Sequence, residues 1–302
     1  MQLVKTTSSV SFKNILFLTD FSDSSNRALA YGLAFARHFK AHLYPAHVID
    51  ADARSAANEG AIQTQEQRTR QQLLRQVEYN GVLFDPLLSR CDFESAIPHW
   101  VAEHSIDLIV MGTQGKQGTQ RFVLGSASDW VVRQAFCPVL TVGSHVEVPR
   151  LFSLVLDKIL FAAGLSSGSS EDSLQYALSL AKDRCARLTL LHVLPEESSN
   201  YHDRSRVLRF TLDELQRSLP AYANSWCKPE MAVDAGDPAE RILVHAQNER
   251  PDLIVMGGPG IRQEDPARST FYLVASSAPC PVLTVPGART NVASRTPRPL
   301  SS

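Results

Sequence analysis

An internal repeat constrains the fold of this chain more than any other feature. Four sequence blocks occur twice, in the same order, at spacings of 143 to 145 residues. The pairs are KNILF at 13–17 with DKILF at 157–161, AHLYPAHV at 41–48 with ARLTLLHV at 186–193, DLIVMG at 107–112 and 252–257, and CPVLTV at 137–142 and 280–285. Solenoid repeats run to only about 20–50 residues, so this period indicates a duplicated domain.

The repeat divides the 302 residues into two units and a tail. We predict a first domain at 1–150, a second at 151–287, and a polar, proline-bearing tail at 288–302 that is disordered. The join falls where polar residues and Pro149 interrupt the pattern. The length suits two cores of ordinary domain size.

Each unit alternates short apolar runs with amphipathic stretches. In the first unit we predict strands at 15–19, 41–49, 82–89, 107–111 and 138–142, and helices after Ser22–Ser25 and at 63–79, 94–104 and 126–135. This alternation predicts an α/β fold, with a five-stranded parallel sheet covered by helices on both faces in each unit. Ligands bind beyond the carboxyl ends of such strands, which places Asp20, Val48 and Gly112 along one rim.

Composition narrows the functional classes. Thirty basic and thirty-one acidic residues give a net charge of −1, without the basic surplus of a nucleic-acid-binding protein. The N-terminal residues lack the apolar core of a signal peptide, and no apolar run reaches the length of a membrane span. Five cysteines without close pairing argue against a disulfide framework. We therefore expect a cytoplasmic protein with neither a nucleic acid nor a membrane as partner.

Glycines follow the fourth predicted strand in the pattern G-x2-G-x9-G-S. Gly112 and Gly115 allow the backbone to turn tightly and approach a ligand, because no β-carbon intervenes. Gly125 and Ser126 open the next helix, whose first N–H groups and dipole favour a phosphate. A single glycine after a strand often marks only a turn, but the spaced set between a strand and a helix predicts a phosphate cradle.

These segments together resemble the universal stress protein family. ILFLTDFS at the first strand, HVID at the second, DLIVMGTQGKQG at the fourth and GSASDWVVRQAFCPVLTV at the end carry the resemblance, which covers nearly all of each unit. The two-unit layout resembles the tandem, E-type branch. The resemblance implies Rossmann-like, adenine-nucleotide-α-hydrolase-like domains. It also implies a regulatory role in the stress response with ATP as ligand, and Mg²⁺ only as a companion of the phosphates.

The resemblance also implies a role for each site residue in the first unit. Asp20 would contact the ribose hydroxyls, the backbone of Val48 would read the adenine edge, and Met111 would line the base. The phosphates would be surrounded by Gly112, Gln114, Gly115, Gly125, Ser126 and Ser128. Lys116 is either a further phosphate contact or a solvated loop lysine. Leu18 stands where ATP-binding members often have proline.

The second unit departs from this pattern. Asp20 aligns with Gly164, Gly125 with Arg268, and Ser128 with Phe271, and the loop between holds Glu264-Asp265-Pro266. Carboxylates repel a polyphosphate, so ATP is not expected to bind here in the same mode. The unit is then either a structural partner in an intramolecular pseudo-dimer, paired through the CPVLTV strands, or a pocket for another ligand. Apolar residues at 271–273 would suit a lipidic or aromatic molecule.

Other chemistry finds less support. The sequence contains no G-x4-G-K-[ST] loop and no G-x-G-x-x-G after the first strand of either unit. No catalytic residue or metal ligand is assigned; His47 and His192 recur at one repeat position and are expected to be packed or hydrogen-bonded. Two alternatives stay open: a slow ATPase, with Asp20 as the only candidate base, and a nucleotide-free scaffold. Pairing of two chains into a homodimer also stays open.

Overall fold

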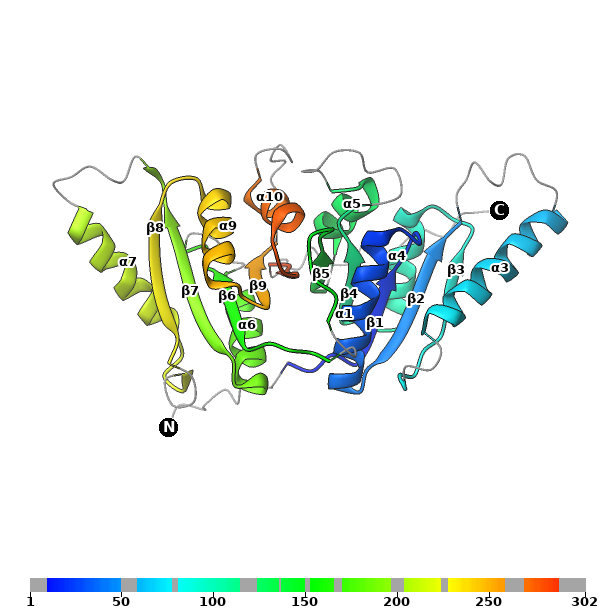
Figure 1. The fold of residues 1–302 in the computed structure, drawn as a ribbon, viewed down its shortest axis with the longest axis horizontal. Coiled ribbons are helices and arrows are strands. Elements are labelled where there is room, and N and C mark those ends of the chain that lie inside the picture. Colours follow the sequence, from blue (N-terminus) through cyan, green and yellow to red (C-terminus); the bar gives the residue numbers. More distant parts are fainter. Residues whose placement is uncertain are drawn as a thin grey trace, which may run out of the picture.

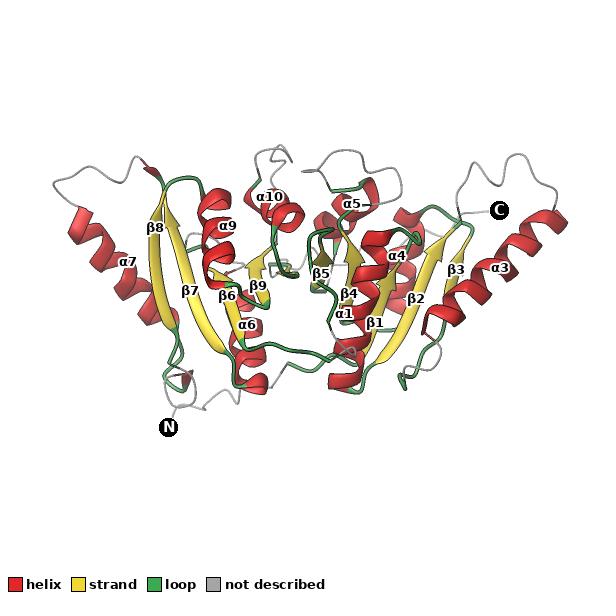
Figure 2. Cartoon of the chain, viewed as in Figure 1, coloured by secondary structure: helices red, strands yellow, loops and turns green. Residues whose placement is uncertain are grey.

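The computed structural model describes residues 10–49, 59–77, 81–114, 124–135, 137–149, 153–165, 170–196, 204–223, 228–258 and 269–287. These residues form two α/β units side by side, and one ten-stranded sheet runs through both (Figures 1 and 2). The strand order is β3-β2-β1-β4-β5-β10-β9-β6-β7-β8. The second unit therefore has the same strand order as the first, but it runs in the opposite direction along the sheet.

The first unit has the predicted alternation of strands and helices. Its elements are β1 (Asn14–Leu18), α1 (Asp23–Phe39), β2 (His42–Val48), α3 (Glu59–Val77), β3 (Leu87–Ser89), α4 (Phe93–Glu103), β4 (Leu108–Gly112), α5 (Ser126–Gln134) and β5 (Val139–Val142). All strand pairs within the unit are parallel, which confirms the predicted five-stranded parallel sheet.

The second unit repeats this arrangement. Its elements are β6 (Lys158–Ala162), α6 (Ser170–Arg184), β7 (Arg187–Leu194), α7 (Arg204–Ser218), β8 (Glu230–Ala235), α9 (Pro238–Glu249), β9 (Leu253–Gly257), α10 (Thr270–Ser277) and β10 (Val282–Val285). Its strands are also parallel to one another.

The third strand is shorter than the sequence suggests. A strand was expected over 82–89, but only Leu87–Ser89 is regular, preceded by an isolated bridge between Leu43 and Phe84. Pro86 lies between the two pieces and has no N–H to donate to the neighbouring strand. The ladder is therefore interrupted at the edge of the sheet.

Helices cover both faces of the sheet, so its central strands are apolar throughout. All five residues of β4 are buried, as are four of the five in β9. One apolar cluster includes α1 and α6 with the strand residues that face them, and a second includes α4, α5, α9 and α10. Each cluster contains residues of both units, so the core is continuous from one unit to the other.

The two units are joined through their last strands. β5 and β10 pair antiparallel, with Leu140 opposite Leu283, and the Thr141 hydroxyl donates to the Val282 carbonyl at 3.3 Å. Leu140 and Leu283 are the same position of the repeated CPVLTV block. The pairing confirms the predicted edge-to-edge junction and covers a strand edge in each unit.

Candidate functional site

The carboxyl ends of β1, β2 and β4 lie at one rim of the first unit. Leu18 pairs with both Ala46 and Met111, and the Thr19 amide donates to the Ala46 carbonyl at 3.0 Å. Asp20, Val48 and Gly112 therefore come together as the strand pattern predicts. The Met111 side chain is buried in the cluster beneath α4 and α5.

The turn after β1 contains Asp20 and, directly after it, a residue with a strained backbone. Phe21 has φ of 62°, a left-handed conformation that is costly for a residue with a bulky side chain. Its ring lies 4.9 Å from that of His47, whose Nδ1 is 2.7 Å from the Thr19 carbonyl oxygen. The Ser22 amide donates to Asp20 Oδ1 at 3.0 Å. These contacts fix the Asp20 carboxylate at the rim.

The end of β4 lies directly against the start of α1. A β-carbon on Gly112 would stand 2.5 Å from Ser24 Oγ, 2.8 Å from the Ser24 carbonyl carbon and 2.9 Å from the Ser25 nitrogen. Two of these atoms are backbone, so only glycine fits without movement of the helix. The Ser22 hydroxyl caps α1 by accepting from the Ser25 amide and donates to the Gln114 carbonyl at 3.3 Å.

The start of α5 forms the remaining side of the rim. Gly125 is its N-cap and has no side chain to bond the first N–H groups, and Ser126 is exposed. The Gly125 amide donates to the Thr113 carbonyl at 2.9 Å, which ties this helix start to the end of β4. Ser128 is buried, and its hydroxyl donates to the Gly112 carbonyl at 2.9 Å. Ser128 thus shapes the loop after β4 instead of presenting its hydroxyl hydrogen at the rim.

The structure brings seven of the expected site residues together at this rim or directly beneath it: Asp20, Val48, Gly112, Gln114, Gly125, Ser126 and Ser128. Gly115 and Lys116 lie outside the described residues. Ser24 also belongs to the rim, although the sequence pattern did not predict it. Its hydroxyl donates to the Val142 carbonyl and lies 3.5 Å from the Gln114 nitrogen. The serines at 22, 24 and 25 are small enough to allow such a close contact, although the sequence does not reveal which segment approaches them.

The rim of the second unit has different chemistry. His192 Nδ1 lies 2.7 Å from the Ala163 carbonyl oxygen, the same bond that His47 makes, so both histidines are hydrogen-bonded as predicted. Of the turn after β6 the structure describes Gly164 and Leu165, and neither has a positive φ, unlike Phe21 in the first unit. Phe271 and Tyr272 are each only 3% exposed and pack edge to face at 5.2 Å between ring centroids. They are core side chains, which weakens the hypothesis of an apolar ligand beside them.

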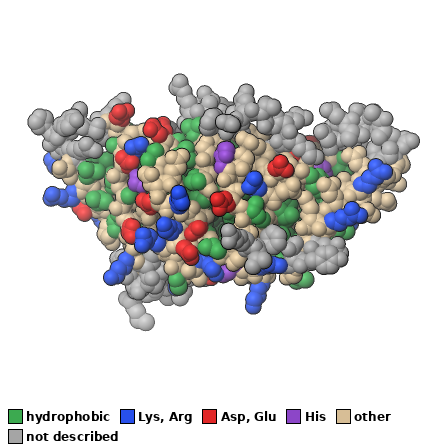
Figure 3. Space-filling model, viewed as in Figure 1, with side chains coloured by type: hydrophobic (Ala, Val, Ile, Leu, Met, Phe, Trp, Pro, Cys, Tyr) green, Lys and Arg blue, Asp and Glu red, His purple; other side chains and the backbone are tan. Residues whose placement is uncertain are grey.

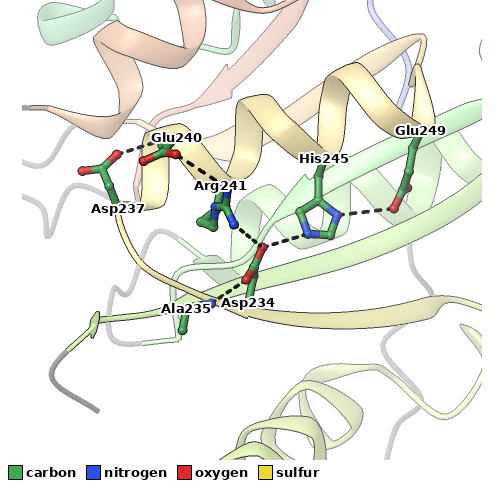
Figure 4. A network of polar contacts seen from close by, with 7 residues as sticks. All are labelled: Asp234, Ala235, Asp237, Glu240, Arg241, His245 and Glu249. Carbon is green, nitrogen blue, oxygen red and sulfur yellow. Dashed lines mark hydrogen bonds and ion pairs between the residues drawn. The ribbon is translucent and has the colours of Figure 1, made fainter. Parts of the chain in front are cut away.

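The second unit also differs at its outer edge, where β8 meets α9. His245 lies between two carboxylates, 3.3 Å from Asp234 and 3.4 Å from Glu249, and Arg241 lies 3.8 Å from Asp234 (Figure 4). The aligned residue of the first unit is the buried Trp100. The second unit therefore has a network of charged and polar side chains where the first unit has a buried tryptophan.

The recurring cysteines are buried thiols with a raised pKa. Cys137 and Cys280 are buried, and burial, with the Asp107 and Asp252 carboxylates as a smaller cause, raises the pKa of each thiol to about 12. Both thiols are therefore protonated at neutral pH. Asp107 itself accepts from the Lys13 and Asn14 amides, at the opposite end of the strands from the rim.

The remaining histidines are dispersed. His42 pairs with Asp85 and His99 with Glu103, each at 3.0 Å. Within the described part of the chain, no three His, Cys, Asp or Glu side chains gather closely enough to hold a metal ion. None of the described helices is long and apolar enough to cross a membrane. On the face drawn in Figure 3, acidic and basic side chains are interspersed.

Comparison with known proteins agrees with the repeat and the fold. The sequence profile of the universal stress protein family matches residues 11–143 and again 156–286. A universal stress protein of Methanocaldococcus jannaschii is 30% identical over 139 residues, which are 43% of this chain and 82% of the relative. A putative universal stress protein of Staphylococcus aureus is 32% identical over 152 residues, 47% of this chain and 90% of the relative.

Solved structures show the same fold over nearly the whole chain. A universal stress protein from Archaeoglobus fulgidus has a TM-score of 0.67 at 20% identity, covering 90% of this chain and 98% of its own. A Pseudomonas aeruginosa protein described as functionally unknown has a TM-score of 0.57 at 16% identity, covering 91% and 93%. With two matches to one family profile and a repeated fold, the chain belongs to the universal stress protein family as a tandem of two such domains.

Proposed function

We propose that this protein is a regulatory, ATP-binding universal stress protein that holds one nucleotide at the rim of its first unit. The observation that carries the proposal is the convergence of Asp20, Gly112 and the glycine-capped start of α5 on that rim. A carboxylate for sugar hydroxyls and an open helix start for phosphates are then available on one ligand-binding edge.

Each part of the nucleotide has a matching group. The phosphates would lie at the N-terminus of α5, where N–H groups point outward and the dipole favours negative charge. Ser126 is exposed there and offers a hydroxyl donor. Asp20 would accept from the ribose hydroxyls, and the backbone at Val48 would contact the adenine. Gln114, with Gly115 and Lys116 next in the sequence, would complete the phosphate site, and Mg²⁺ would accompany the phosphates.

The second unit would serve as the structural partner of the first. It has Gly164 where the first unit has Asp20, so a ribose would find no carboxylate there, and Leu165 lacks the left-handed conformation of Phe21. Its buried Phe271 stands where the first unit has Ser128, the residue that supports the phosphate-side loop. Binding in the same mode is therefore confined to the first unit, with occupancy adjusting the surface of the molecule around that rim.

Replacing Asp20 by alanine should weaken ATP binding by about tenfold, because a carboxylate bonded to two hydroxyls contributes on the order of 1.5 kcal/mol. Titration calorimetry with ATP gives both the dissociation constant and the stoichiometry. The matched control is Asp213→Ala, since Asp213 is exposed on α7 in the other unit. Two nucleotides per wild-type chain, or unchanged affinity in Asp20→Ala, would contradict the proposal. Phosphate release that Asp20→Ala abolishes would instead support the slow ATPase.

A further inference from the structure

The two units face each other across a pseudo-twofold axis that passes through the β5–β10 pair. Leu140 and Leu283 are equivalent positions of the repeat and lie opposite each other in the ladder. In a symmetric pair of identical domains, any residue on such an axis would meet its own copy. Here the two units belong to one chain and have separate sequences, so equivalent residues near the axis can differ.

The axis meets α1 and α6 on one face of the sheet. Residues 29–37, LAYGLAFAR, align with residues 174–182, LQYALSLAK, and both helices end at a left-handed residue with φ of 54°, Lys40 and Cys185. His38 is therefore equivalent to Asp183. These two unlike residues contact each other, with His38 Nε2 donating to Asp183 Oδ2. Arg184 Nη1 lies 3.3 Å from His38 Nδ1 and donates to it.

Unlike residues also meet on the opposite face, between α5 and α10. Asp129 and Tyr272 are equivalent positions, as are Arg133 and Ser276. The Arg133 guanidinium carbon lies 5.1 Å from the centre of the Tyr272 ring, while Arg133 Nε donates to Asp129 Oδ1 at 2.9 Å. One unit thus supplies the cation and the other supplies the aromatic face.

A third unlike contact lies where the segment before β1 reaches the second unit (Figure 1). The Val10 amide donates to the Ser179 hydroxyl at 2.6 Å, and the Phe12 ring stacks on Tyr176 with centroids 6.2 Å apart. Ser179 is equivalent to Ala34, which has no hydroxyl to accept this bond. The surface of α6 therefore fits this segment through a group that α1 lacks.

We propose that these contacts make the facing surfaces of the two units specific for each other, so that the first unit takes its own second unit as partner in preference to the first unit of another copy. Pairing of two first units would place His38 beside His38 and give Arg133 no aromatic ring. It would also replace the Ser179 acceptor by Ala34. The partner that this surface fits is the covalently linked second unit.

Asp183→His in the full chain tests the proposal, because it reproduces the His–His contact of two first units. Losing this partly buried pair should speed amide exchange of the β5 and β10 peptides about fivefold, with the β1 and β2 peptides unchanged. The reciprocal variant His38→Asp/Asp183→His restores an unlike pair and should return exchange at the junction to the wild-type rate. Hydrogen exchange with mass spectrometry at neutral pH measures both.

Two further variants keep the result decisive. Asp213→His makes the same chemical change on exposed α7 and should leave the junction unaffected. Ser179→Ala gives α6 the residue of α1 and should speed exchange near Val10 about threefold, from loss of one hydrogen bond. Unchanged junction exchange in Asp183→His, or no recovery in the reciprocal variant, would overturn the proposal.

Discussion

Gly125→Arg is expected to lower the affinity for ATP about 100-fold while the fold stays intact. Gly125 caps α5 with φ of −60° and ψ of 155°, an extended conformation that any residue adopts, and it is only half-buried. The new side chain would occupy the helix start where the phosphates bind. Loss of two charge-assisted hydrogen bonds, each contributing about 1.5 kcal/mol or more, gives this magnitude. The second unit has Arg268 at the same position.

Equilibrium binding of labelled ATP to wild type and variant measures this effect. Gly60→Arg is the matched control, because Gly60 is an exposed glycine of α3 and the added charge is the same. Circular dichroism and the urea midpoint should be unchanged in both variants. Equal ATP affinity in Gly125→Arg and wild type would refute a phosphate site at α5.

Gly112→Ala is expected to destabilise the first unit by about 2 kcal/mol and to abolish its ligand site. The added β-carbon would overlap the backbone of Ser24 and Ser25, as well as the Ser24 hydroxyl, so the start of α1 must move. That movement would break the bonds of Ser22 and Ser24 to Gln114. Stability and binding should therefore fall together, as measured by urea unfolding and ATP titration.

Gly32→Ala is the matched control for this prediction. A β-carbon at Gly32 would lie 3.8 Å from Leu43 and Val110, in ordinary contact, within the middle of α1. Since alanine favours a helix over glycine, this variant should be more stable by about 0.5–1 kcal/mol. A Gly112→Ala protein as stable as wild type would show that α1 can shift without cost.

Much of the fold could be predicted from the sequence because the repeat shows each element twice. Strands such as β4 are buried on both faces and appear as unbroken apolar runs. The length of β3 could not be predicted in the same way. Apolar residues lie on both sides of Pro86, so the sequence suggests one continuous strand. Pro86 has no N–H to donate, and the regular pairing begins only after it.

The candidate site could be predicted in its position but not in its supporting contacts. Strand ends place Asp20 and Gly112, and the glycine pattern places Gly125. The close approach of Ser24 to Gly112 depends on how α1 packs across β4, which local sequence does not encode. Ser128 shows the same limit, since a hydroxyl at a helix start fits both a ligand contact and the observed bond to Gly112.

The antiparallel β5–β10 pair makes strand pairing by the second unit independent of ligand binding by that unit. β10 shields the edge of β5 through backbone bonds and a leucine contact, none of which involves the ligand rim. Substitutions at the second rim therefore leave no strand edge exposed to other chains. One copy can lose or change its ligand without a penalty in solubility, whereas deletion of that copy would expose β5 to aggregation.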